Sequence, residues 1–189
     1  GEFVLDDHPT TTFVWADADA RYVRRSGSDA ADGASPASAW QTIGKAASSV
    51  TPGETVYVGA GIYTENVKLT IDGTVDAPIT FVADTSGERT GDEGEVVIDG
   101  QAAPFTVAID GASYNRLEGF TIRGGRGTQR HVRKGGGILI ESSSPTLAGN
   151  VITANGAPQG LGGGICVEGG APVISHNEVY GNWAGRGGG

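Results

Sequence analysis

Short apolar runs separated by glycine, asparagine and proline fill most of the chain, and their pattern repeats. The sequence GGGILIE at residues 135–141 recurs 27 positions later as GGGICVE at 162–168, and the same shift carries Asn150 to Asn177. A weaker copy, VAID at 107–110, precedes them. Each unit holds brief runs in which apolar and other positions alternate, and such runs are strands because they are too short for helices.

A repeat of three short strands cannot close its own core, but stacked repeats can, because each strand pairs with its equivalent ~4.8 Å away. The sequence therefore predicts an all-β solenoid, a parallel β-helix with three strands per coil. We expect Asn150 and Asn177 to form a stacked ladder, although both could be ordinary turn residues. Alternation predicts four inward side chains, Ile138, Ile140, Ile165 and Val167, and four outward ones, Leu139, Glu141, Cys166 and Glu168.

The pattern changes near the N-terminus. Upstream strands are predicted at 56–58, 67–69, 79–82 and 96–98, but from Ser38 to Val50 the apolar residues recur at helical spacing. This spacing predicts an amphipathic helix over 38–50, with Ser38 as its N-cap, that covers the open end of the core.

Three segments follow from these patterns. Residues 1–3 (GEF) resemble a cloning scar, residues 4–53 form an N-terminal segment and cap, and residues 54–189 form the coils. The chain stops at Gly189, where the next Gly-Gly-Gly-Ile strand is due. We therefore expect the native coils to continue, and we expect this chain to self-associate through an uncapped C-terminal coil.

Composition narrows the classes of function. Glycine makes up 33 of the 189 residues, more than twice the usual ~7%, and the formal net charge is −9. This charge argues against general attraction to nucleic acid or anionic lipid. No apolar run approaches the ~20 residues of a membrane helix, and the single Cys166 excludes a disulfide framework.

Several N-terminal motifs carry a family resemblance. They are Tyr22-Val23, Gly27-Ser28-Asp29, Asp32-Gly33, SAWQTI at 38–43, Lys45-Ala46, PGETVYV at 52–58 and GIYTE at 61–65. Together they resemble the N-terminal signature of secreted bacterial right-handed parallel β-helix proteins, a group similar to the pectate lyase and related polysaccharide lyase superfamily. The resemblance implies a right-handed coil, a secreted or cell-surface location and carbohydrate as the ligand. Members include lyases, epimerases and proteins with no assigned reaction, so it does not decide whether the chain is an enzyme.

An outward column of carboxylates is the first candidate site. Asp110, Glu141 and Glu168 occupy equivalent positions in three units, so their side chains should stack roughly 5 Å apart. Such a column raises the pKa of its own carboxylates, binds a cation, or is splayed into solvent as a charged face, and Ca2+ is a cation that suits carboxylate oxygens. Lyases of the resembling fold are known for calcium that bridges enzyme and uronate.

A basic segment is the second candidate. Residues 123–134 hold five of the 13 Lys and Arg residues in an otherwise acidic chain. Arginine forks there could bind the carboxylates or sulfates of an acidic polysaccharide. The resemblance also implies an Arg or Lys base for elimination, but spacing selects none, and a loop that only neutralises nearby carboxylates fits equally. The candidate ligand-binding residues are Arg126, Arg130, His131, Arg133 and Lys134.

Two functions stay open at this point. The first is an extracellular module that interacts with acidic polysaccharide, as part of a lyase or epimerase or without catalysis. The second is a non-catalytic structural or adhesive repeat protein. Converging basic and acidic side chains in a groove would favour the first function, and smooth faces with few loops would favour the second.

Overall fold

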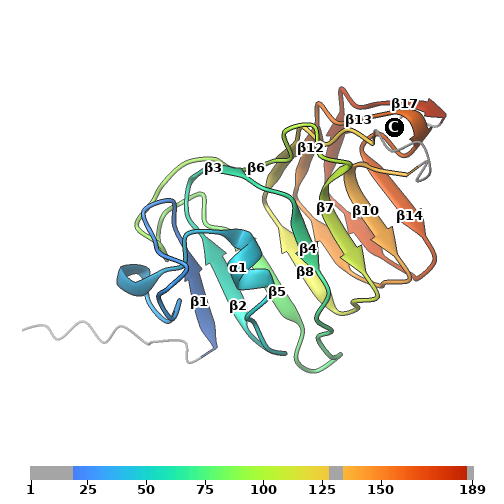
Figure 1. The fold of residues 1–189 in the computed structure, drawn as a ribbon. Coiled ribbons are helices and arrows are strands. Elements are labelled where there is room, and N and C mark those ends of the chain that lie inside the picture. Colours follow the sequence, from blue (N-terminus) through green and yellow to red (C-terminus); the bar gives the residue numbers. More distant parts are fainter. Residues whose placement is uncertain (1–18, 128–133, 187–189) are drawn as a thin grey trace, which may run out of the picture.

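The computed structural model describes residues 19–127 and 134–186. Parallel strands stack along the molecule from the N-terminal end to the C-terminal end, so the chain coils around one continuous core (Figure 1). Every coil between the first and the last contributes one strand to each of three sheets, which we name sheets A, B and C in the order in which a coil passes through them.

Sheet A contains six strands, β1 (Ala20–Val23), β2 (Thr55–Val58), β5 (Ile79–Ala83), β8 (Asn115–Glu118), β11 (Thr146–Ala148) and β15 (Val173–Ser175). Sheet B contains β3 (Gly61–Thr64), β6 (Val96–Asp99), β9 (Thr121–Arg123), β12 (Val151–Thr153) and β16 (Glu178–Tyr180). Sheet C contains β4 (Val67–Leu69), β7 (Phe105–Asp110), β10 (Gly136–Glu141) and β14 (Ile165–Glu168). A small sheet D pairs β13 (Gly156–Leu161) with β17 (Trp183–Arg186).

The stacking register follows the sequence repeat. Ile138 lies opposite Val107 in the preceding coil and opposite Ile165 in the following one, and all of these pairings are parallel. The all-β, right-handed parallel β-helix with three strands per coil is therefore confirmed. Sheet D was not predicted, and it lies between the sheet B and sheet C strands of the later coils.

The N-terminal helix is shorter than predicted. In place of one helix over 38–50, the chain forms a 3-10 turn, η1 (Pro36–Ser38), and a five-residue helix, α1 (Ile43–Ala47). The N-cap is Thr42, whose hydroxyl accepts the amide of Lys45 at 3.1 Å, so the prediction of Ser38 as N-cap was wrong.

Residues just before α1 are held extended, which explains the late helix start. Trp40 forms a parallel bridge with Val23, and its indole nitrogen donates to the carbonyl of Ala31 at 3.0 Å. The Asp29 carboxylate accepts the amides of Gln41 and Thr42 at 2.9 and 3.0 Å. These bonds fix residues 40–42 against the first strand, so the helix cannot begin before Ile43.

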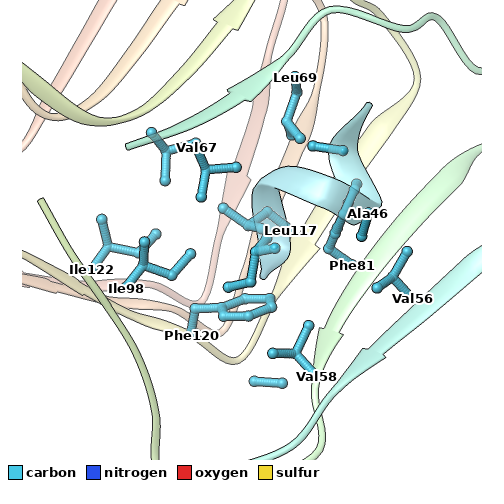
Figure 2. Close-up of a cluster of buried hydrophobic side chains, with 14 of the residues drawn as sticks. Ala46, Val56, Val58, Val67, Leu69, Phe81, Ile98, Leu117, Phe120 and Ile122 are labelled. Carbon is cyan, nitrogen blue, oxygen red and sulfur yellow. The ribbon is translucent and has the colours of Figure 1, made fainter. Parts of the chain in front are cut away.

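The core is apolar and continuous from α1 into the coils. Ile43, Ala46 and Ala47 are buried on α1 and belong to the same cluster as the inward side chains of the sheets. In Figure 2, Ala46 lies among side chains from sheets A and C, including Phe81 and Leu69. The helix therefore covers part of the core near the N-terminal end, as the sequence predicts.

Asparagine ladders lie in the turns on both sides of sheet B. The predicted ladder is confirmed, because the Asn150 side chain donates to Oδ1 of Asn177 at 2.9 Å. A second ladder on the other side of sheet B was not predicted, and in it the Asn155 side chain donates to Oδ1 of Asn182 at 3.1 Å.

Burial on sheet C differs from simple alternation. Ile138 and Ile140 are fully buried, but Leu139 and Cys166, predicted to point outward, are also buried although they lie outside the core cluster. The backbone of Gly162 lies against Cys166, so the segment before β14 folds back over this outer position. Val167, predicted to point inward, is 44% exposed.

Candidate functional site

A groove of about 200 Å³ lies on the outer face of sheet C. It spans three successive coils, because its walls come from β4, β7 and β10 and from the residue after β4. It combines an apolar floor with charged and hydroxyl side chains, and its lining residues are Lys68, Thr70, Phe105, Ala108, Asp110 and Glu141.

Strand register explains why these side chains meet. Lys68 lies opposite Ala108, so both face outward in one column while Val67 and Leu69 face the core. The small Ala108 leaves room between its larger neighbours, and the Lys68 ammonium lies 5.8 Å from the centre of the Phe105 ring, within cation–π range. The groove is thus the space above an alanine between a lysine, a phenylalanine ring and carboxylates.

The predicted acidic column is in register. Glu141 pairs with Asp110 of the preceding coil and with Glu168 of the following coil. A basic residue interrupts the column, because the Lys134 ammonium contacts Glu141 at 3.0 Å and also forms an ion pair with Glu168. Among the described residues, Asp110 has no ion-pair partner, so it is the carboxylate of the column that is left for a ligand.

Electrostatics at Lys134 follow from these contacts. The hydrogen bond to Glu168, followed by the one to Glu141, raises the pKa of Lys134 above its ordinary value. Nearby, burial raises the pKa of the Cys166 thiol, so this side chain is a neutral neighbour at physiological pH. The charged Lys134 therefore pairs with both Glu141 and Glu168 and offsets one of their two negative charges.

Lys134 lies beside two of the three predicted calcium ligands, Glu141 and Glu168. In residues 19–127 and 134–186, no three His, Cys, Asp or Glu side chains gather closely enough to hold a metal ion. The oxygens of Glu141 and Glu168 are directed to Lys134 instead. Calcium binding by Asp110, Glu141 and Glu168 stays a prediction.

The basic segment is only partly described. Arg130, His131 and Arg133 lie outside the described residues. Arg126 is exposed, and its backbone amide donates to the carbonyl of Ala103 at 2.6 Å. Of the five predicted ligand-binding residues, the structure therefore brings Lys134 to the carboxylate column.

Lys68, Thr70 and Phe105 were missed as site residues. The signal was present for Lys68, because the Val67-Lys68-Leu69 alternation turns the lysine outward on the same sheet as Asp110. Phe105 gave no such signal, because a phenylalanine at the start of a strand is expected in the core. Its half-buried ring instead lines the outer groove.

Three parallel sheets stacked around one core define a right-handed parallel β-helix. Residues 25–187 match the family described as "Protein of unknown function (DUF1565)", and the chain belongs to this right-handed β-helix family. Among curated proteins, no sequence matches this chain.

Solved structures that are similar to this chain include two lyases. Pectate lyase Pel9A superposes with a TM-score of 0.59 at 15% identity, over 86% of this chain and 48% of that one. A rhamnogalacturonan lyase gives a TM-score of 0.48 at 15% identity, over 84% of this chain and 51% of that one. This chain spans about half the length of either structure, and the likeness to Pel9A establishes the fold. Within the described residues, no helix is long and apolar enough to cross a membrane.

Proposed function

We propose that the outer face of sheet C binds an acidic polysaccharide outside the cell. The observation that carries the proposal is the groove itself, in which Lys68, Phe105 and Asp110 surround an alanine floor. Because the walls come from three successive coils, the groove extends along the stacking direction, which suits a linear polymer. The name of the similar structure, pectate lyase Pel9A, is consistent with a ligand of this class.

Each wall of the groove has a chemical role in this proposal. The apolar face of a sugar ring packs against Phe105 and Ala108, and the exposed ammonium of Lys68 binds a uronate carboxylate. Asp110 accepts hydrogen bonds from sugar hydroxyls. Lys134, at the end of the basic segment, adds positive charge beside the groove through its contact with Glu141 at 3.0 Å.

The proposal concerns binding, with membership of a lyase or epimerase as its extension. Lys68 is the basic side chain among the six groove residues, so it is the residue whose substitution tests the binding. Calcium enters the proposal as a ligand of the acidic column, and it is tested in the same titrations.

The test is calorimetric titration with hexagalacturonate, an alginate hexamer and a chondroitin sulfate hexamer, each with and without Ca2+. Lys68→Ala should weaken binding of a responsive oligomer at least about tenfold, because a charge-assisted contact is lost. Lys45→Ala is the matched control, since Lys45 also lies over an aromatic ring, Trp40, at 6.0 Å but on α1. Formation of the unsaturated product, followed by ultraviolet absorbance, would extend the proposal to elimination.

Two results would overturn the proposal. One is the absence of binding to any of the three oligomers under both conditions. The other is an equal loss of affinity in Lys68→Ala and Lys45→Ala, because the loss would then come from the change in overall charge and not from the groove.

The alternative, a non-catalytic structural or adhesive repeat, is favoured by one observation. The last coil exposes inward-type side chains, with Ile174 44% and Val179 38% exposed. If no glycan binds and the chain self-associates through this surface, the structural role is the better account.

A further inference from the structure

We propose that a second groove, on the outer side of sheet A, binds a neutral linear glycan. This sheet A groove has a volume of about 300 Å³ and lies where the chain enters the sheet A strands. None of its residues lines the sheet C groove, so the proposal does not depend on the function argued above.

The groove follows the solenoid axis. Val75, Tyr114, Ser144 and Val173 line it and lie just before or at the start of β5, β8, β11 and β15. These strands are consecutive neighbours in sheet A. Successive strands are ~4.8 Å apart, so the groove has the shape of a track for an extended polymer and not of a pocket for a compact molecule.

Exposed apolar side chains in the groove could pack against sugar rings. Tyr114 is 49% exposed, Val75 75% and Val173 57%. Aromatic and aliphatic faces of this kind stack on the C–H face of a sugar, whose hydroxyls point outward at the ring edge. Isolated exposed apolar residues are ordinary on protein surfaces, but three from different coils in one groove indicate a binding surface.

The Tyr114 ring is held by an unusual and rigid backbone. Tyr114 has φ +57°, a left-handed conformation that is rare for a bulky residue. Its carbonyl accepts the amide of Ile79 at 3.1 Å, and its amide donates to Ser144 at 3.3 Å. Gly73 lies so close that an added Cβ would meet the Tyr114 carbonyl oxygen at 2.6 Å. The neighbouring coils therefore fix the backbone from which the Tyr114 ring projects.

A side-chain ladder stiffens the turns beside the groove. Asp72 accepts the amide of Ser113 at 2.7 Å, the Ser113 hydroxyl accepts the amide of Ser144 at 3.2 Å, and the Ser144 hydroxyl accepts the amide of Ala171 at 3.1 Å. Each bond joins equivalent positions of adjacent coils. Binding to a surface already ordered in this way loses little conformational entropy.

The charges favour a neutral ligand. Arg116 lines the groove, but its guanidinium donates to Glu118 at 2.8 Å, so its charge is already matched. None of the residues that line this groove therefore offers an unmatched positive charge to an acidic ligand. The polar groups that remain are hydroxyls such as that of Thr146, which pair well with sugar hydroxyls.

The backbone argues against a peptide ligand. An extended peptide gains affinity by adding to a free strand edge, where main-chain groups are unpaired. In this groove the amides of Ile79, Tyr114 and Val173 all donate to carbonyls of neighbouring coils. A peptide would find few main-chain partners, whereas a glycan needs none.

The test is calorimetric titration of the protein with cellohexaose, xylohexaose and mannohexaose. At least one should bind, and Tyr114→Asn should weaken it about tenfold because the ring is lost. Asparagine tolerates the left-handed backbone, so this variant should keep its fold, which thermal unfolding verifies. Tyr114→Phe should retain the affinity within about twofold, because it keeps the ring.

Lys68→Ala separates this proposal from the first one, because it alters the sheet C groove and should leave neutral-glycan binding unchanged. The proposal is overturned if none of the three hexasaccharides binds, if a folded Tyr114→Asn variant binds as well as the parent, or if Lys68→Ala abolishes the binding. Binding of a proline-rich peptide in place of all three hexasaccharides would also overturn it.

Discussion

Asn150 donates from its backbone amide and from its side-chain amide to the same atom, Oδ1 of Asn177, each at 2.9 Å. Its own Oδ1 accepts the amide of Phe120 at 3.0 Å, and its side chain also donates to the carbonyl of Leu117 at 2.8 Å. Asn150 is fully buried, so water cannot replace these partners. One side chain therefore joins three successive coils.

Asn150→Ala should destabilise the protein by roughly 3 kcal/mol, because it removes three side-chain hydrogen bonds and leaves the Phe120 amide buried without a partner. Asn177→Ala should cost less, about 2 kcal/mol, because it takes the acceptor from the two Asn150 donors but removes a side chain that is itself only half-buried. Urea denaturation followed by circular dichroism measures both. Equal losses for the two variants would contradict the argument from burial.

Gly33→Ala should be more destabilising than Gly111→Ala, although both glycines have left-handed backbones, with φ +70° and +62°. The shared strain costs roughly 1–2 kcal/mol. At Gly33 an added Cβ would also meet the Trp40 ring at 2.6 Å, whereas at Gly111 it would meet nothing within 4 Å. The difference in thermal midpoint between the two variants measures the contribution of Trp40 packing against the N-terminal turn. Identical midpoints would show that this packing can adjust freely.

Lys134→Met should free Glu141 and Glu168 from their shared partner and increase the affinity for Ca2+. Two adjacent carboxylates without a cation repel each other, and a divalent ion relieves this repulsion. Calorimetric titration with Ca2+ compares the variant with the parent. A parent protein that binds Ca2+ as tightly as the variant would contradict competition between Lys134 and the metal.

The same variant has a pH signature. Because its partners raise the pKa of Lys134 above the ordinary 10.5, the ion pairs stabilise the folded protein fully below that value. The stabilisation is lost as the pH rises through the higher pKa of the folded state. The parent should therefore melt above Lys134→Met at neutral pH, and the two should converge in strong alkali. Ion pairs that contribute nothing would give equal midpoints at every pH.

The repeat made the architecture predictable. The 27-residue shift places Ile138 over Ile165 and Asn150 over Asn177, and both pairings are present in the structure. When strands stack in register, residues at equivalent positions of the repeat become neighbours in adjacent coils. The carboxylate column on sheet C could be placed for the same reason.

Other features depend on contacts that a repeat does not encode. The helical spacing around Trp40 was genuine, but Asp29 accepts the backbone amides just after it and delays the helix. Strand β13 was missed because its sequence, GAPQGL, lacks apolar alternation. Leu139 was expected on the surface because alternation predicts only the direction of a side chain. It does not predict whether another segment covers that side chain. The ion pairs of Lys134 with Glu141 and Glu168 could not be predicted, because Lys134 lies before the repeated strand.

Ile174 and Val179 lead to the prediction of self-association. They lie opposite Leu147 and Ile152, which are fully buried, yet Ile174 is 44% exposed and Val179 38% exposed. Burying such side chains against a second copy is favourable by about 25 cal/mol per Å². Light scattering should therefore show a mass above the monomer at high concentration, and Ile174→Lys should reduce it. Ile62→Lys is the matched control, because Ile62 is 49% exposed on sheet B and should not alter the mass. A monomer at every concentration, or equal effects of the two lysine variants, would contradict association through the last coil.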